Sequence, residues 1–84
     1  MTMTGRGNII GLHWSKKNTE EFIRDFCKRN GCEIMNYNLD YKTAREIASE
    51  IRFFEKIALL YPDADRDTRE RQRILGKLKE RGVI

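Results

Sequence analysis

The chain has 84 residues, of which 39% are hydrophobic and 36% charged. This length allows one domain with a thin core, and the composition excludes a disordered chain and favours a helix-rich globular fold. No apolar run approaches the roughly 18 residues that cross a bilayer, so we predict a single domain over residues 1–84 with no membrane partner.

Two cysteines, Cys27 and Cys32, are the only ones in the chain. A secreted domain of this size usually carries more, so we expect two free thiols in a cytoplasmic protein. The N-terminus also lacks the long apolar segment of a signal peptide.

Basic residues outnumber acidic ones by 17 to 13, which gives a net charge of +4. Residues 64–84 carry +3 of that excess. A basic segment of this kind suits contact with phosphate groups or with an acidic protein surface.

The N-terminal region precedes the first periodic pattern. Residues 1–8 show no periodicity, and we predict a flexible lead-in there. Residues 9–14 alternate, with Ile10, Leu12 and Trp14 on one side, which predicts a short strand.

A first helix follows. Asn18 is the expected N-cap, because Glu21 stands three residues later and completes a capping-box pattern. Asn30 and Gly31 are expected to end the helix, since glycine readily adopts positive φ. Its inner face is expected to contain Phe22, Ile23, Phe26 and Cys27.

Residues 32–38 alternate again and predict a second strand, parallel or antiparallel to the first. Two strands alone are marginal. We therefore expect a homodimer, in which either strands pair between protomers or the long helix described next covers the sheet and dimerises.

The most continuous apolar stripe lies in residues 40–61 and predicts a long central helix. Asn38 or Asp40 is its expected cap, and it must stop at or before Pro62. Arg52 can pair with Glu55 three residues later. The stripe consists of Ala44, Ile47, Ala48, Ile51, Phe54, Ala58 and Tyr61, widened by Ile57 and Leu60.

A final helix is predicted for residues 68–81, beginning at Asp67 or Thr68 and ending before Gly82. The predicted fold class is therefore α+β, in the order strand–helix–strand–helix–helix, with both strands packed on the central helix. The last helix has a narrow apolar seam of Ile74, Leu75 and Leu78.

No residue set indicates catalysis. His13 is the only histidine, and with Cys27 and Cys32 it provides three of the four ligands that zinc needs. The acidic run that begins at Asp63 lacks the glycine and the glutamate of a calcium loop. We predict a protein that is not an enzyme and uses no metal, cofactor or small-molecule substrate.

The leading functional hypothesis is an accessory or regulatory protein that binds DNA or RNA through its basic C-terminal helix. The segment RILGKLKERGVI resembles the end of a recognition helix in winged helix-turn-helix proteins, over residues 73–84 alone, and we assign no family from it. The expected phosphate-binding residues are Arg66, Arg69, Arg73, Lys77, Lys79 and Arg81, assisted by Lys16 and Lys17.

The alternative hypothesis is a protein-binding inhibitor or adaptor of a larger nucleic-acid-processing or defence complex, of the kind that phages and mobile elements encode. Aromatic residues together with arginines are typical of interface centres. The expected interface residues are His13, Trp14, Tyr37, Tyr41 and Phe53.

Overall fold

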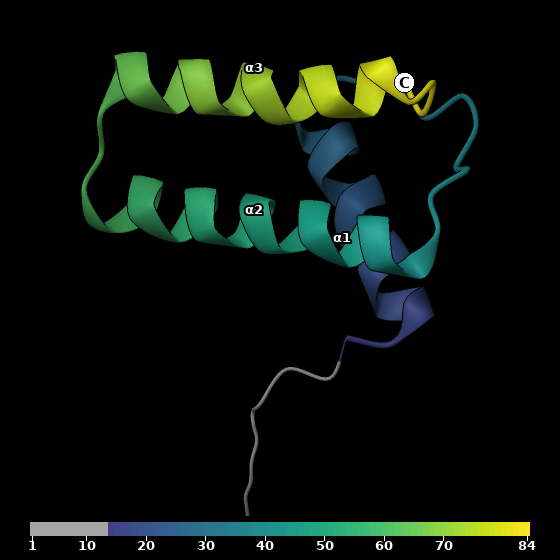
Figure 1. Cartoon of the computed structure of the whole chain (residues 1–84). Helices are drawn as coiled ribbons and strands as arrows, with labels where there is room; N and C mark the ends of the chain where they lie inside the picture. The colour runs from purple at the N-terminus through teal and green to yellow at the C-terminus, as the bar shows by residue number, and fades with distance from the viewer. Residues whose placement is uncertain (1–13) are drawn as a thin grey trace, which may run out of the picture.

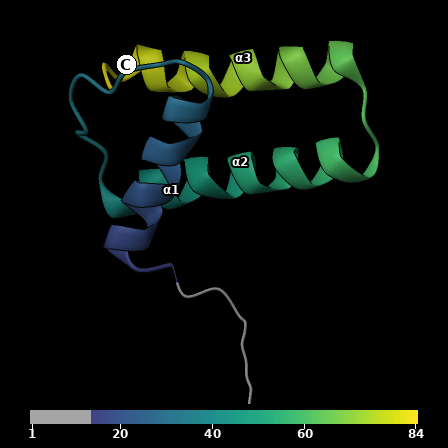
Figure 2. The same cartoon turned by 180° about the vertical axis from the view of Figure 1, so that it is seen from behind.

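The structure, a computed structural model, describes residues 14–84 and contains three helices. They are α1 (Lys16–Arg29), α2 (Tyr41–Leu60) and α3 (Ala64–Glu80). Helices α2 and α3 run side by side in opposite directions, and α1 crosses α2 near its N-terminal end (Figure 1). The view from behind shows the same arrangement (Figure 2).

The fold is all-helical over the described residues, so the predicted α+β class is wrong. Residues 32–38 form a linker, in which Met35 and Asn36 donate their N–H groups to the Val83 carbonyl at 2.7 and 3.3 Å. Alternation along seven residues favours an extended chain, but a strand also needs an extended neighbour over several residues. Within residues 14–84, Val83 is the only residue that pairs with the middle of this segment, which is too short a neighbour for a strand.

Several predictions concern residues that the structure does not describe. They are the flexible lead-in at 1–8, most of the first predicted strand, and His13. Trp14, the last residue of that strand, directly precedes the turn into α1 and is not in a strand. A homodimer built on paired strands therefore loses its structural basis.

Helix α1 begins earlier than the sequence predicted. Ser15 is the N-cap, and its Oγ accepts a hydrogen bond from the Asn18 N–H at 3.1 Å. A serine hydroxyl satisfies the exposed N–H groups of a first turn as well as an asparagine does. As a consequence Lys16 and Lys17 are part of the first helical turn, whereas the predicted cap Asn18 is inside the helix.

Helix α3 also begins earlier than predicted, at Ala64. Asp63 is the cap, because its Oδ1 accepts from the Arg66 N–H at 3.1 Å. In return, Asp67 accepts a hydrogen bond from the Asp63 N–H at 3.2 Å. The predicted start at Asp67 or Thr68 therefore lies one turn inside the helix.

Other boundary predictions are confirmed. Asp40 caps α2, which ends at Leu60, two residues before Pro62. Gly31 follows α1 with φ at 70°, and Gly82 follows α3 with φ at 77°. These two glycines end their helices in a conformation that other residues rarely adopt.

The hydrophobic core lies at one end of the α2–α3 hairpin. It joins α1 to the first half of α2, to the second half of α3 and to the tail after α3. Its members, all at most 3% exposed, are Ile23, Phe26, Cys27, Ala44, Ile47, Ala48, Ile51, Ile74, Leu78 and Val83. The core thus ends at Ile51 on α2 and at Ile74 on α3, and both helices continue beyond it.

Candidate interaction surfaces

Half of the basic residues predicted on the last helix take part in ion pairs within the chain. Arg73 lies 2.9 Å from Glu50 on α2 and 2.9 Å from Glu70, and Lys77 lies 2.7 Å from Glu50. Arg66 pairs with Asp67 at 2.9 Å. A phosphate group would have to compete with these carboxylates for the same guanidinium and ammonium groups.

These contacts also shift the pKa of the groups that make them. Burial favours the protonated form of Glu50, but hydrogen bonds from Lys77 and Arg73 outweigh it, so that the pKa of Glu50 is lowered. Hydrogen bonds to Glu70 and Glu50 raise the pKa of Arg73. Both shifts stabilise the charged forms, so this cluster remains ionised near neutral pH.

The other predicted phosphate-binding residues do not join this cluster. Arg69, Lys79 and Arg81 are exposed, as are Lys16 and Lys17 at the start of α1. Within residues 14–84 none of these five side chains makes an ion pair. Of the eight predicted residues, three are therefore paired with carboxylates of the same chain and five are exposed without such a pair.

The predicted aromatic residues lie in two places. Tyr37 lies beneath the guanidinium of Arg24, whose Cζ is 5.4 Å from the ring centre. Tyr41 instead donates a hydrogen bond from its hydroxyl group to the Trp14 carbonyl. Trp14 and Phe53 line one hollow together, so that Trp14 links Tyr41 and Phe53, whereas Tyr37 contacts Arg24 of α1.

Beyond the core, the two helices of the hairpin do not match in polarity. We call residues 52–73 the distal hairpin. The α3 segment at 64–73, ADRDTRERQR, contains one small apolar residue, Ala64, and no large one. After Phe54, which still packs against the core, the apolar stripe of α2 therefore faces no large apolar residue on α3.

This mismatch opens a groove of about 390 Å³ between α2 and α3. We call it the distal groove. Phe53, Phe54 and Ile57 are its apolar lining, and Ser49, Glu50, Arg66, Glu70 and Arg73 are its polar lining. Phe54 is partly covered by a charged side chain, because the Cζ of Arg71 lies 5.9 Å from its ring centre.

Large apolar side chains in the distal half of α2 and just after it are exposed to solvent. Phe53 is 69% exposed, and three consecutive residues at the end of α2 and after it, Leu59, Leu60 and Tyr61, are 80%, 56% and 67% exposed. The sequence placed Leu60 and Tyr61 on the buried stripe. The missing apolar residues at 64–73 were the signal that nothing on α3 would cover them.

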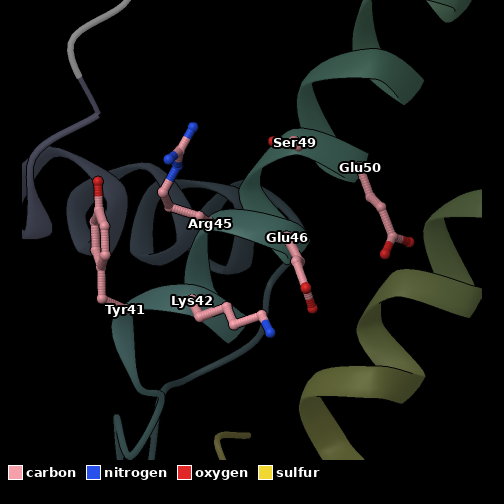
Figure 3. A pocket seen from close by; sticks show the side chains of 6 residues that line it. All are labelled: Tyr41, Lys42, Arg45, Glu46, Ser49 and Glu50. Carbon is pink, nitrogen blue, oxygen red and sulfur yellow. The ribbon is translucent and has the colours of Figure 1, made fainter.

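A second hollow, of about 670 Å³, lies along α2 (Figure 3). Tyr41 and Arg45 point away from α3, whereas Glu50 points towards it (Figure 3). The hollow is lined by Tyr41, Lys42, Arg45, Glu46, Ser49 and Glu50. This lining includes neither a cysteine nor a histidine.

The described residues offer little support for covalent or metal chemistry. Cys27 is buried, and burial together with the nearby Cys32 raises the pKa of its thiol, which disfavours a reactive thiolate. Within residues 14–84 no three His, Cys, Asp or Glu side chains lie together as a metal site requires. None of the helices in this part of the chain has both the length and the apolar character of a membrane span.

Comparison of the sequence with protein-family models and with curated proteins, and of the structure with solved structures, finds no match.

Proposed function

We propose that this protein is a non-enzymatic protein-binding module, and that its distal groove binds an amphipathic helix of a partner protein. One observation carries the proposal. The apolar stripe of α2 continues past the core to Phe53, Ile57 and Leu60, where the facing half of α3 offers charged and polar side chains. Exposed apolar surface of this kind is typical of interaction sites.

A helix is the best occupant because the chain already packs one on the same hairpin. Helix α1 crosses the core end of the hairpin and buries Ile23 and Phe26 there (Figure 1). The distal end has no such cover from the described residues. A partner helix with an apolar ridge would cover the distal groove as α1 covers the core.

A second copy of the chain is a poorer occupant. The protein carries a net charge of +4, and a symmetric dimer places the same patch of each copy against the other. Around the distal hairpin, Arg52, Lys56 and Arg69 make no ion pair within residues 14–84. Pairing this surface with itself would bring like charges together, which is unfavourable.

The apolar side chains exposed at the distal groove should support a complex of moderate affinity, as is common in regulatory interactions. Burying one large apolar side chain stabilises a complex by roughly 1.5–3 kcal/mol. Association itself costs roughly 4–15 kcal/mol. Phe53, Leu60 and their neighbours can therefore offset much of this cost, and hydrogen bonds at the polar rim of the groove would supply the remainder.

The test uses charge introduced at the groove and at a matched exposed site. The tagged chain is purified from cells of its source after nuclease treatment, alongside the double variant Phe53→Asp, Leu60→Asp and the control Met35→Asp. Met35 is 81% exposed and lies in the linker before α2. We expect one stoichiometric protein partner with the unmodified chain and the control, and its loss from the double variant.

Two results would contradict the proposal. One is the absence of any stoichiometric partner, and the other is a partner that the double variant retains. Circular dichroism should show that all three proteins have equal helix content, because the substituted side chains are exposed and lie outside the core.

A further inference from the structure

We propose that the outer face of α2, together with Trp14, binds single-stranded nucleic acid. We call this surface the Trp14 face and define it as Trp14, Arg45, Ser49, Arg52 and Lys56. The sequence assigned phosphate binding to α3 instead, and the proposal rests on contacts that the sequence does not reveal. Trp14 and the three cations do not line the distal groove, although Ser49 and Phe53 line both that groove and a hollow beside Trp14.

The cations of this face lie on one side of a helix. Arg45, Arg52 and Lys56 are spaced by seven and four residues, which places them in one row at 3.6 residues per turn. The row extends about 16 Å along the helix axis, at a rise of 1.5 Å per residue. That length matches a few nucleotides of an extended strand.

The charges of these cations are not paired within the described residues, although the Cζ of Arg45 lies 5.8 Å from the ring centre of Tyr41. None of the three makes an ion pair within residues 14–84. Glu55, the acid that the sequence predicted as the partner of Arg52, instead accepts a hydrogen bond from Arg29 at 2.6 Å. This bond between α1 and α2 neutralises Glu55 with a cation from outside the Trp14 face.

Trp14 supplies the aromatic component beside the cations. A hollow of about 240 Å³ is lined by Trp14, Ser49, Arg52, Phe53 and Lys56. A second hollow, of about 600 Å³, is also lined by Trp14, Arg52 and Lys56, together with Glu55, whose carboxylate is paired with Arg29. Trp14 therefore lies where two hollows meet, with the same two cations in each.

One contact holds the indole ring of Trp14, and a second holds its backbone. Its ring centre lies 5.2 Å from that of Phe22 in an edge-to-face arrangement. The Trp14 backbone carbonyl accepts a hydrogen bond from the Tyr41 hydroxyl group. Trp14 is only partly buried, so part of the held ring remains open to a ligand.

An aromatic ring beside a row of cations suits single strands better than duplexes. Unpaired bases stack on aromatic side chains while basic groups track the phosphates. In a duplex the bases are already stacked on each other, and a ring in a hollow cannot reach their faces. The expected ligand is therefore a single strand, without a preference for particular bases.

The experiment uses the intact chain and two probes, a 20-nucleotide oligo(dT) and a 20-base-pair DNA duplex. The chain contains one tryptophan, so its fluorescence reports directly on Trp14. We expect oligo(dT) to quench this fluorescence and to bind more tightly than the duplex. Three phosphate contacts would weaken binding roughly 20-fold between 50 and 200 mM salt.

Matched charge reversals locate the site. Arg52→Glu with Lys56→Glu should weaken oligo(dT) binding at least tenfold. Arg69→Glu with Lys79→Glu changes the total charge equally on α3 and should weaken it less than threefold. Trp14→Leu should weaken it at least fivefold, as expected for loss of a stacked base.

Four results would overturn the proposal. They are no binding at 50 mM salt, tighter binding to the duplex, binding without quenching, and equal losses from the two double variants. None of them bears on the partner-capture experiment with Phe53 and Leu60, so the failure of one proposal is distinguishable from the failure of the other.

Discussion

The Glu50 carboxylate on α2 lies 2.7 Å from the Lys77 ammonium group on α3. Arg73 reaches the same carboxylate at 2.9 Å. Glu50 directly precedes Ile51, and Arg73 directly precedes Ile74, the last buried residues of the core on their helices. This ion-pair cluster therefore marks where the core ends and the distal hairpin begins.

Replacing Glu50 by Gln should destabilise the protein by about 1 kcal/mol at pH 7, the sum expected for two partly exposed ion pairs. Because folding lowers the pKa of Glu50, its contribution is complete above the pKa of the unfolded chain and is lost as pH falls through the folded pKa. Urea titrations from pH 7 to pH 3 should therefore show the two proteins converging in acid. A constant difference at all pH values would contradict this account.

The core and the distal hairpin should respond differently to truncation. Ile51 is fully buried, so Ile51→Ala should cost roughly 2–5 kcal/mol and leave a protein of this size barely folded. Phe53→Ala, two residues later, should change the free energy of unfolding by less than about 0.5 kcal/mol, because that side chain is mostly exposed. Thermal denaturation compares the two variants directly. A large loss for Phe53→Ala would show that the ring is buried in the isolated chain.

Gly76 offers a stabilising substitution. It lies inside α3, and a Cβ placed there would meet nothing within 4 Å. Gly76→Ala should therefore stabilise the protein by about 1 kcal/mol, through helix propensity alone. A decrease in stability would show that a Cβ at position 76 does meet a neighbouring atom.

Gly82→Ala is the matched control for that substitution. It also has open space around it, but its φ of 77° is unfavourable for alanine. It should destabilise the protein by roughly 1–2 kcal/mol. Opposite signs for the two variants in chemical denaturation are the expected result.

The two cysteines should differ in reactivity. Cys27 is completely buried and its thiol pKa is raised by burial, whereas Cys32 is partly exposed in the linker. Iodoacetamide at pH 8 should modify Cys32 well before Cys27, as followed by peptide mass spectrometry. Equal rates in the native protein, or faster labelling of Cys27, would contradict the placement of Cys27 in the core.

Local signals predicted the helices well and the rest of the fold poorly. Asp40, Pro62, Gly31 and Gly82 act on their own neighbours, so the boundaries they set were readable from the sequence. Other boundaries were wrong because two residues competed to cap the same helix. Ser15 precedes Asn18, and either side chain can satisfy a first turn.

The second predicted strand was wrong for a different reason, which also explains why the ion pairs of the basic residues on α3 could not be predicted. Alternation at 32–38 says nothing about whether an extended neighbour exists, and among residues 14–84 only Val83 pairs with the middle of this segment. The positive charges of α3 were visible in the sequence. The pairing of Arg73 with Glu50, however, depends on how α3 is aligned against α2. Both outcomes depend on contacts between residues far apart in the sequence.

The most direct test of the proposed function is site-specific photo-crosslinking in the source cells. A photoreactive phenylalanine analogue replaces Phe53 in one protein and Met35 in the other, since both positions are exposed and neither belongs to the core. We expect one discrete crosslinked protein from position 53, unaffected by nuclease, and no such product from position 35. Identical products from both positions, or none from position 53, would contradict a protein-binding groove at this end of the hairpin.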